Sequence, residues 1–212
     1  MEAAAVNDKP LKLGDMMVSG APSAKLIKTA AVIAEALHPS FERLSLRSRD
    51  SCVLSSLAVR DFLFKIGFRS AEVVPVVFVI RADQDGKEIH SLGIGDPYDK
   101  GVDAAGRWSG HMVTRLPDEG FLIDTTLFQA ARPQWPALPG MVLLPLSPSD
   151  QPVFGLSRIS GFEMTADDGR AVVGMWLEQP RNKRWRGAPD TSKRRREPVV
   201  GALVERFGSW SN

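Results

Sequence analysis

Hydrophobic residues recur with a helical period in residues 23–38 and again from residue 52 onward. In the first segment, one helical stripe is formed by Leu26, Ile27, Ala30, Ile33, Ala34 and Leu37. Ser23 is a suitable N-cap, and we expect this helix to end at His38 and Pro39, because proline lacks the amide proton that continues a helix.

The second helical pattern follows a polar connection that contains several arginines. Its apolar positions are Leu54, Leu57, Ala58, Phe62 and Ile66. Asp50 or Ser51 can act as the N-cap, and Gly67 is a typical residue at which a helix stops. Cys52, the only cysteine in the chain, therefore falls in the first turn of this helix.

Strand-like runs follow the two helices. Residues 71–80 (AEVVPVVFVI) form a β-branched run typical of a buried strand, and Pro75 favours an edge or a bulge. Residues 81–107 are rich in Gly and Asp and predict a long loop that carries either a function or a further short element. HMVTRL and FLIDT, on either side of residues 117–120, predict a β-hairpin.

The last third of the chain predicts two more strands, at residues 141–146 and 171–177, and one helix. We expect this helix to open at Pro198, with an apolar face formed by Val200, Leu203, Val204 and Phe207. The order of elements predicts an α+β fold, with N-terminal helices packed on a mostly antiparallel β-sheet. Residues 1–22 show no period and predict an irregular arm, so residues 23–212 are expected to form a single domain.

Composition narrows the possible chemistry. The 212 residues are 43% hydrophobic and 25% charged, with a net charge of +2, as in ordinary globular proteins. One cysteine excludes an internal disulfide framework, and three scattered histidines show no metal-ligand spacing, so we expect neither a metal nor a cofactor. No secretory leader or membrane span is visible, which predicts a cytoplasmic protein, although an unusual secretion signal would escape this pattern.

The predicted hairpin leads to a geometric test. If residues 117–120 form its loop, Leu116 lies opposite Phe121, and His111 and Asp124 project from the same face of the sheet. These two residues are then diagonal neighbours, with backbones roughly 7–8 Å apart, a separation that their side chains can bridge with a hydrogen bond. A shift of one residue would place Asp124 on the opposite face.

Cys52, His111 and Asp124 together predict nucleophilic chemistry. A carboxylate on one imidazole nitrogen fixes the tautomer and the orientation of the ring, which leaves the other nitrogen free to take a proton from a thiol. The unpaired amides in the first turn of a helix favour a thiolate at Cys52 and can also stabilise an oxyanion. We therefore expect Cys52 to be a nucleophile, His111 to be a base and then an acid, and Asp124 to orient His111.

A cysteine that opens a helix, followed by a histidine in WSGHMV and an aspartate in FLIDTT, resembles the papain-like cysteine hydrolase superfamily and especially its transglutaminase-like branch. The resemblance covers residues 48–130 and implies a papain/transglutaminase-like core with a Cys-His-Asp triad. It implies acyl transfer from a peptide, protein or small amide, as in a protein glutamine deamidase, a transglutaminase, a peptidase or an amidase. No glutamine lies at residues 46–50, where papain-type proteases carry an oxyanion donor, so the candidate donors are the Cys52 amide and Ser48.

Other interpretations of these residues stay open. Cys52 could be a buried hydrophobic residue, and Asp124 could cap a turn. Trp108 could be a substrate platform or part of the core, Gly110 could allow a substrate backbone to approach closely, and Gln129 could line the site. His38 and His90 are expected to have no part in the site.

A basic stretch suggests a function of another class. Residues 181–196 (RNKRWRGAPDTSKRRR) contain eight Lys or Arg residues and one Asp, a local charge of +7 in a chain whose total is +2. We expect a basic loop here. Its arginines could contact nucleic acid or another anionic surface: Arg184, Arg186, Arg194, Arg195 and Arg196. The alternative function is therefore a non-catalytic binding protein on the same scaffold, and a solvated loop without a partner is the simplest interpretation.

Overall fold

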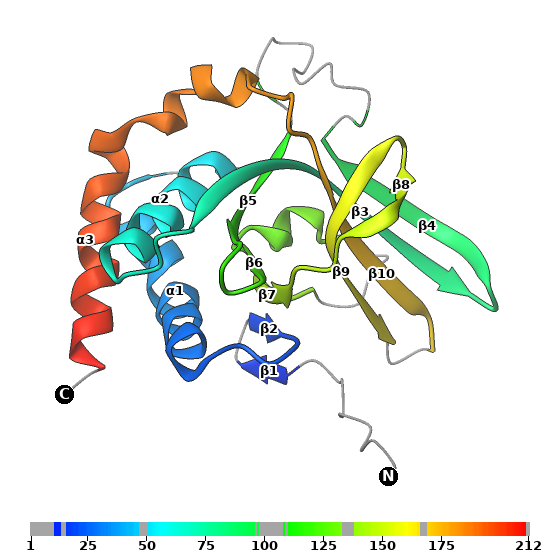
Figure 1. Cartoon of the computed structure of the whole chain (residues 1–212), viewed down its shortest axis with the longest axis horizontal. Coiled ribbons are helices and arrows are strands. Elements are labelled where there is room, and N and C mark those ends of the chain that lie inside the picture. The colour runs from blue at the N-terminus through cyan, green and yellow to red at the C-terminus, as the bar shows by residue number, and fades with distance from the viewer. Residues whose placement is uncertain are drawn as a thin grey trace.

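The computed structural model of the chain describes residues 11–13, 16–46, 51–95, 97, 108, 110–132, 138–165 and 169–210. Within these residues there are three α-helices: α1 (Ala24–Arg43), α2 (Cys52–Lys65) and α3 (Lys193–Ser209). The three helices lie together on one side of the molecule, and the sheet extends away from them (Figure 1). Helices α1 and α2 both pack against α3, and α2 also packs on the sheet.

The described strands form one ten-stranded sheet in the order β1-β2-β7-β6-β5-β3-β10-β9-β8, and β4 pairs with β3 outside this path. Their bounds are β1 (Leu11–Leu13), β2 (Met16–Val18), β3 (Glu72–Gln84), β4 (Lys87–Ile94), β5 (His111–Leu116), β6 (Phe121–Asp124), β7 (Met141–Pro145), β8 (Ser149–Val153), β9 (Leu156–Thr165) and β10 (Ala171–Glu178). The β2–β7 pair is parallel and the other pairs are antiparallel. The expected α+β class, with helices on a mostly antiparallel sheet, is confirmed.

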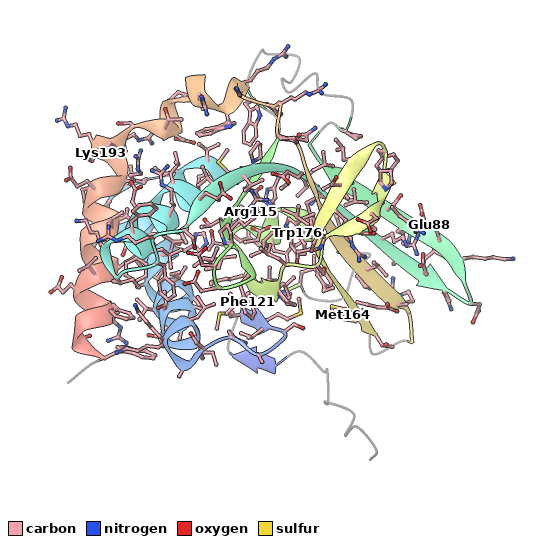
Figure 2. All side chains as sticks on the ribbon, in the orientation of Figure 1. Glu88, Arg115, Phe121, Met164, Trp176 and Lys193 are labelled. Atoms are coloured by element: carbon pink, nitrogen blue, oxygen red, sulfur yellow. The ribbon has the colours of Figure 1, made fainter. Side chains whose placement is uncertain are left out.

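The core has two main parts, one on each face of the sheet. Between the helices and the sheet lie Leu26, Ile33, Phe41, Phe62, Leu116, Phe121, Leu143 and Leu203, among others. The opposite face is also buried, because the sheet curls around its own side chains, including Val76, Phe78, Val113, Leu122, Phe162 and Trp176. Figure 2 shows Trp176 among the crowded side chains of this inner face, whereas Glu88 lies on the outlying β3–β4 hairpin. Alternation along β5 and β6 therefore decides which residues enter the curl.

Helix α1 begins as expected but does not stop at Pro39. The Ser23 hydroxyl accepts a hydrogen bond from the Leu26 amide at 3.2 Å, which confirms the predicted N-cap. The helix continues through Pro39 to Arg43, so the predicted end was wrong. Phe41 is fully buried in the core between the helices and the sheet, and this packing outweighs the hydrogen bond that the proline removes.

Strand β3 is longer than residues 71–80, and the expected loop at residues 81–107 contains a strand. Asp85 and Gly86 have φ angles of 52° and 73° and make the tight turn between β3 and β4, a signal that the sequence carried. Residues 96 and 98–107 lie outside the described residues. Pro75 is inside the sheet, paired with Met112, but its carbonyl accepts from the Gln179 amide just beyond the end of β10. The nitrogen of Pro75, which has no proton to donate, therefore lies just beyond the last paired residue of β10, where the strand pairing no longer needs a donor.

Besides β4, four further strands were missed by the sequence analysis. Strands β1 and β2 lie within the expected irregular arm, and β2 pairs in parallel with β7 over Met16–Val18. Strands β8 and β9 form a hairpin around Phe154 and Gly155. Strands of three residues carry too short a pattern to be recognised, and β2 is held in place by a partner that is more than 120 residues away in sequence.

Helix α3 begins at Lys193, five residues before the expected start at Pro198, so residues 181–196 are not a simple loop. The stretch contains the 3₁₀ turns η2 (Arg184–Gly187) and η3 (Pro189–Thr191), followed by the first turn of α3. Arg196 is only 8% exposed, and its Nε donates to Asp61 Oδ2 on α2 at 2.5 Å. Arg195 pairs with Asp190 at 2.9 Å. Two of the five arginines considered for an anionic partner are therefore already ion-paired.

Replacing Arg196 by alanine is expected to lower the free energy of unfolding by about 1–3 kcal/mol, because Asp61 loses its main partner across the α2–α3 contact. Burial raises the pKa of Asp61, but hydrogen bonds from Arg196 and Arg60 lower this pKa by a larger amount. The net pKa of Asp61 is therefore below 3.8. Urea unfolding at pH 7 measures the loss. Arg194→Ala, at an exposed neighbouring position, should change the free energy of unfolding by less than about 0.5 kcal/mol, and equal effects of the two variants would contradict the prediction.

Candidate active site

Cys52 is the first residue of α2, as the sequence predicted, with Ser51 as the N-cap residue. Its side chain is only 6% exposed and packs in a small cluster with Val53, Leu57 and Met112. Cys52 Sγ lies 3.8 Å from the carbonyl oxygen of Gly110, the residue that leads into β5. The start of α2 and the start of β5 therefore meet at the thiol.

The predicted hairpin register is confirmed. Thr114 pairs with Ile123, Arg115 with Leu122 and Leu116 with Phe121, so residues 117–120 form the loop. His111 and Asp124 consequently share one face of the sheet, the face inside the curl. His111 Nε2 lies 2.7 Å from Asp124 Oδ2, and neither side chain is exposed at all.

Asp124 accepts hydrogen bonds from three residues. Its Oδ2 accepts from His111 and from Trp176 Nε1, the latter at 2.9 Å. Its Oδ1 accepts from the backbone amide of Thr126 at 2.8 Å and from the Thr126 hydroxyl at 3.2 Å. Asp124 thus caps the turn after β6 and holds His111 at the same time, so the two interpretations of this residue are compatible.

The buried pair shifts both pKa values. Burial lowers the pKa of His111, but the charge and the hydrogen bond of Asp124 more than offset this effect, and interactions with Cys52 add to it, so the pKa is raised to about 10. Burial raises the pKa of Asp124, but the charge and hydrogen bond of His111, with the Thr126 and Trp176 hydrogen bonds, lower it below 3.8. At neutral pH the pair is therefore an imidazolium and a carboxylate.

This pair predicts a loss of stability at alkaline pH. The pKa of His111 is raised from 6.5 to about 10 on folding, so its contribution is fully present below pH 6.5 and is lost as pH rises through about 10. We expect the free energy of unfolding to fall by roughly 2–5 kcal/mol over this range, measured by urea unfolding at a series of pH values. In His111→Gln this slope should disappear. An unchanged slope in the variant would assign the loss to other groups.

The geometry leaves one nitrogen of His111 for proton exchange. Nε2 is held by Asp124, whereas Nδ1 is buried and has no hydrogen-bond partner of good geometry among the described residues. Cys52 is near enough to raise the pKa of His111. The ring is thus fixed from one side by a carboxylate, while its other side is available to the thiol.

Trp108 and Gly110 form the wall next to Cys52. Trp108 packs against the Cys52 cluster, and its Nε1 donates to Asn182 Oδ1 at 3.3 Å. A Cβ atom at Gly110 would lie 2.3 Å from the Trp108 ring, so only glycine fits at this position. Trp108 therefore fills the space next to Gly110. The sequence analysis expected a substrate backbone to come close to Gly110, and in the structure the indole of Trp108 occupies this place.

The two remaining candidates are not brought into this group. Ser48 lies outside the described residues. Gln129 lies in the 3₁₀ turn η1 (Leu127–Ala130), and its Nε2 is buried without a hydrogen-bond partner in the described part of the chain. A contact of either residue with substrate stays a prediction.

Two residues near the site were missed. Trp176 lay in a predicted strand, and a buried indole needs an acceptor for its N–H, but the pairing of β10 with β3 that brings it to Asp124 cannot be inferred from sequence. His38 was expected to have no role, yet its Nε2 donates to the Thr125 carbonyl at 2.7 Å, next to Asp124. This bond ties α1 to the end of β6.

The fold and site define an α+β protein with a buried His-Asp pair beside a single thiol at a helix start. No family model matches the sequence, and no curated protein or solved structure gives a match. Among the described helices, none is long and apolar enough to cross a membrane. The same part of the chain contains no group of three or more His, Cys, Asp or Glu side chains that could hold a metal ion.

Proposed function

We propose that the chain is a cysteine-dependent hydrolase or acyltransferase that acts on an amide bond through an acyl-enzyme at Cys52. One observation carries the proposal: a fully buried His111–Asp124 pair with a 2.7 Å hydrogen bond lies next to the only thiol, at the N-terminus of α2. Buried ionisable pairs of this kind are expensive to maintain, and they concentrate at functional sites.

The residues divide the reaction into two balanced steps. Cys52 Sγ attacks the substrate carbonyl carbon, and the thiol proton resides on His111 Nδ1. The tetrahedral intermediate collapses, the C–N bond breaks, and the leaving amine takes the proton from Nδ1, which leaves a thioester on Cys52. Water or a second amine then gives its proton to Nδ1 as it attacks the thioester, the C–S bond breaks, and Cys52 leaves as the thiolate with the proton kept on Nδ1, which restores the starting state.

Asp124 and the helix terminus assist without changing covalently. Asp124 keeps Nε2 protonated and holds the ring plane, so the proton moves only at Nδ1. The Cys52 amide is the proposed oxyanion donor, because the first amides of a helix point outward and carry partial positive charge. Trp176, through Asp124, is a positioning residue.

The order of the three residues and their placement on a helix start and two adjacent strands support a papain-like arrangement, and the transglutaminase-like branch is the favoured version. Protein glutamine deamidation, transglutamination and peptide cleavage share the first step and differ in the leaving group and in the nucleophile of the second step. The proposal covers these reactions as one class.

Product analysis separates these reactions. A glutamine-containing peptide is incubated with the protein, with and without a primary amine, and ammonia and peptide mass are measured. Ammonia with a mass gain of one dalton indicates deamidation, incorporation of the amine indicates transfer, and shortened peptides indicate a peptidase. Cys52→Ala must abolish whichever product forms. No ammonia in either condition would exclude both glutamine-directed versions, and a product that persists in Cys52→Ala would exclude the whole proposal.

The alternative function, a non-catalytic protein that binds an anionic partner through residues 181–196, has less support from the structure than from the sequence alone. Arg195 and Arg196 are paired with Asp190 and Asp61, which reduces the charge available to an anionic partner. A salt-dependent electrophoretic shift with nucleic acid tests what remains. Arg194→Gln is the informative variant, because Arg196 is part of the α2–α3 contact.

A further inference from the structure

A concave site lies between α2, α3, η2 and the start of β3. It encloses about 690 Å³, within the range of pockets that bind ligands. Its apolar lining includes Phe64, Val73, Trp185 and Val200, and Phe64 is 38% exposed. Large exposed hydrophobic side chains in a concave site favour binding of an apolar group.

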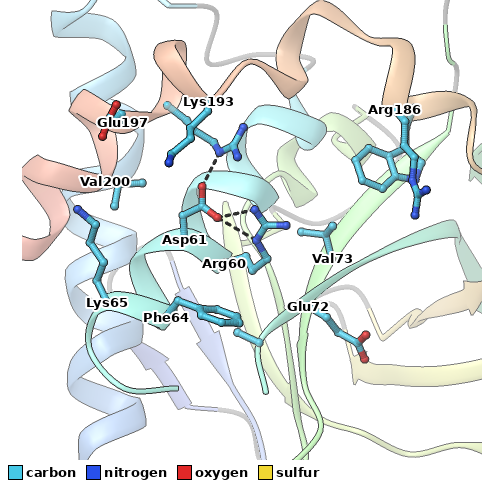
Figure 3. A pocket seen from close by; sticks show the side chains of 13 residues that line it. Arg60, Asp61, Phe64, Lys65, Glu72, Val73, Arg186, Lys193, Glu197 and Val200 are labelled. Carbon is cyan, nitrogen blue, oxygen red and sulfur yellow. Dashed lines mark hydrogen bonds and ion pairs between the residues drawn. The ribbon is translucent and has the colours of Figure 1, made fainter. Parts of the chain in front are cut away.

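Cations exceed anions around this pocket. Five lining residues are Lys or Arg and three are Asp or Glu. Asp61 is bound by Arg60 and Arg196, and Glu72 is bound by Arg115, so these carboxylates are already neutralised. Lys65 and Lys193 lie at one end of the pocket and Arg186 at the other, with Arg60 between them (Figure 3). A ligand with separated negative charges is therefore complementary.

The pocket adjoins the proposed active site through two shared residues. Val73 and Trp185 line the pocket, and both pack against the cluster that contains Cys52 and Met112. The guanidinium carbon of Arg186 lies 5.6 Å from the centroid of the Trp185 indole ring, so the two side chains are in contact. An occupant of the pocket would thus rest against the same side chains that enclose the thiol.

We propose that this pocket binds an acidic peptide segment with one apolar anchor residue, and that it docks protein substrates of the Cys52 site. A peptide fits better than a nucleic acid strand, because a peptide can place its carboxylates only beside Lys65, Lys193 and Arg186, whereas a phosphate at every step would also meet the lining carboxylate Glu197. An apolar anchor suits the Phe64 and Trp185 rings, whereas spaced carboxylates suit Lys65, Lys193 and Arg186. The docking role rests on the proposed function, but the binding does not.

Fluorescence anisotropy with Cys52→Ala protein tests binding separately from catalysis. The probe is a fluorescein-labelled twelve-residue peptide of Glu and Ser with one central Leu. Its controls replace each Glu by Gln, or Leu by Ser, and a single-stranded oligonucleotide of equal charge serves as a competitor. We expect saturable binding of the probe only, weakened about fivefold or more by Lys193→Glu.

The charge control is Lys87→Glu, at an exposed position on β4 and outside the pocket lining, which should leave affinity unchanged. Lys193→Glu should fold normally, because an acidic residue is favourable in the first turn of α3. No saturable binding, equal binding of the Leu→Ser peptide, or equal effects of the two variants would overturn the proposal. Tighter binding of the oligonucleotide would assign the pocket to nucleic acid instead. Peptide binding without any Cys52-dependent product would leave the pocket standing and refute the proposed function.

Discussion

Replacing His111 by alanine is expected to slow alkylation of Cys52 by iodoacetamide at pH 7 by about thirtyfold, because an ordinary cysteine thiol is only a few per cent ionised at this pH. The proposed function assigns the thiol proton of the wild-type protein to His111, which lies beside Cys52 at the start of α2. Rates are measured from pH 4 to 10 by intact mass, and the mass shift has one assignment because the chain contains one cysteine.

Two controls make the alkylation result interpretable. His90→Ala, at an exposed position on β4, should alkylate at the wild-type rate. His111→Gln retains more of the buried volume than His111→Ala, and circular dichroism of both variants shows whether they are folded. If the folded wild-type thiol is inert at every pH and reacts only in urea, Cys52 is a core residue and the proposed function fails.

Replacing Asp124 by alanine is expected to lower the free energy of unfolding by about 3–5 kcal/mol. The substitution removes the acceptor of four buried donors on three residues: the His111 ring, the Trp176 indole, and the amide and hydroxyl of Thr126. Urea unfolding at pH 7 measures the loss. Asp150→Ala, at an exposed position on β8, should change the free energy of unfolding by less than about 0.5 kcal/mol.

Two further variants and a series of acid pH values show which hydrogen bonds of Asp124 contribute to the free energy of unfolding. Asp124→Asn keeps an oxygen acceptor and should lose less stability than Asp124→Ala, and Trp176→Phe, which removes one donor and keeps a ring, should lose about 1–2 kcal/mol. The pKa of Asp124 is lowered on folding, so its contribution is present above pH 3.8 and is lost as pH falls further. A loss below about 1 kcal/mol in Asp124→Ala would mean that the pair does not hold the fold together.

The burial of the site has a consequence for substrate access. Trp108 covers Gly110 and packs beside Cys52, a residue that is only 6% exposed. Trp108 is fixed in part by its hydrogen bond to Asn182, which lies between β10 and η2. Under the proposed function, a substrate has to reach Sγ past the side chains packed around it, and Trp108 is one of them, so it is both a core residue and a boundary of the proposed site.

Local patterns in the sequence determined the starts of α1 and α2 and the hairpin. Ser23 and the apolar stripe after it place the start of α1, and Gly67, with a φ of 99°, ends α2, because capping and left-handed conformations depend on a few neighbouring residues. The four-residue loop at 117–120 sets the register that brings His111 to Asp124, because side chains alternate strictly along a strand. The central pair of the site was therefore predictable from one hairpin.

Tertiary structure decided the rest. Helix α1 runs through Pro39 because Phe41 is buried, and α3 begins at Lys193 because Arg196 finds Asp61 on α2. The indole of Trp176 reaches Asp124 only because β10 pairs with β3 and the sheet curls. These contacts join residues that are far apart in the chain, and their energies depend on packing and burial that no local pattern records.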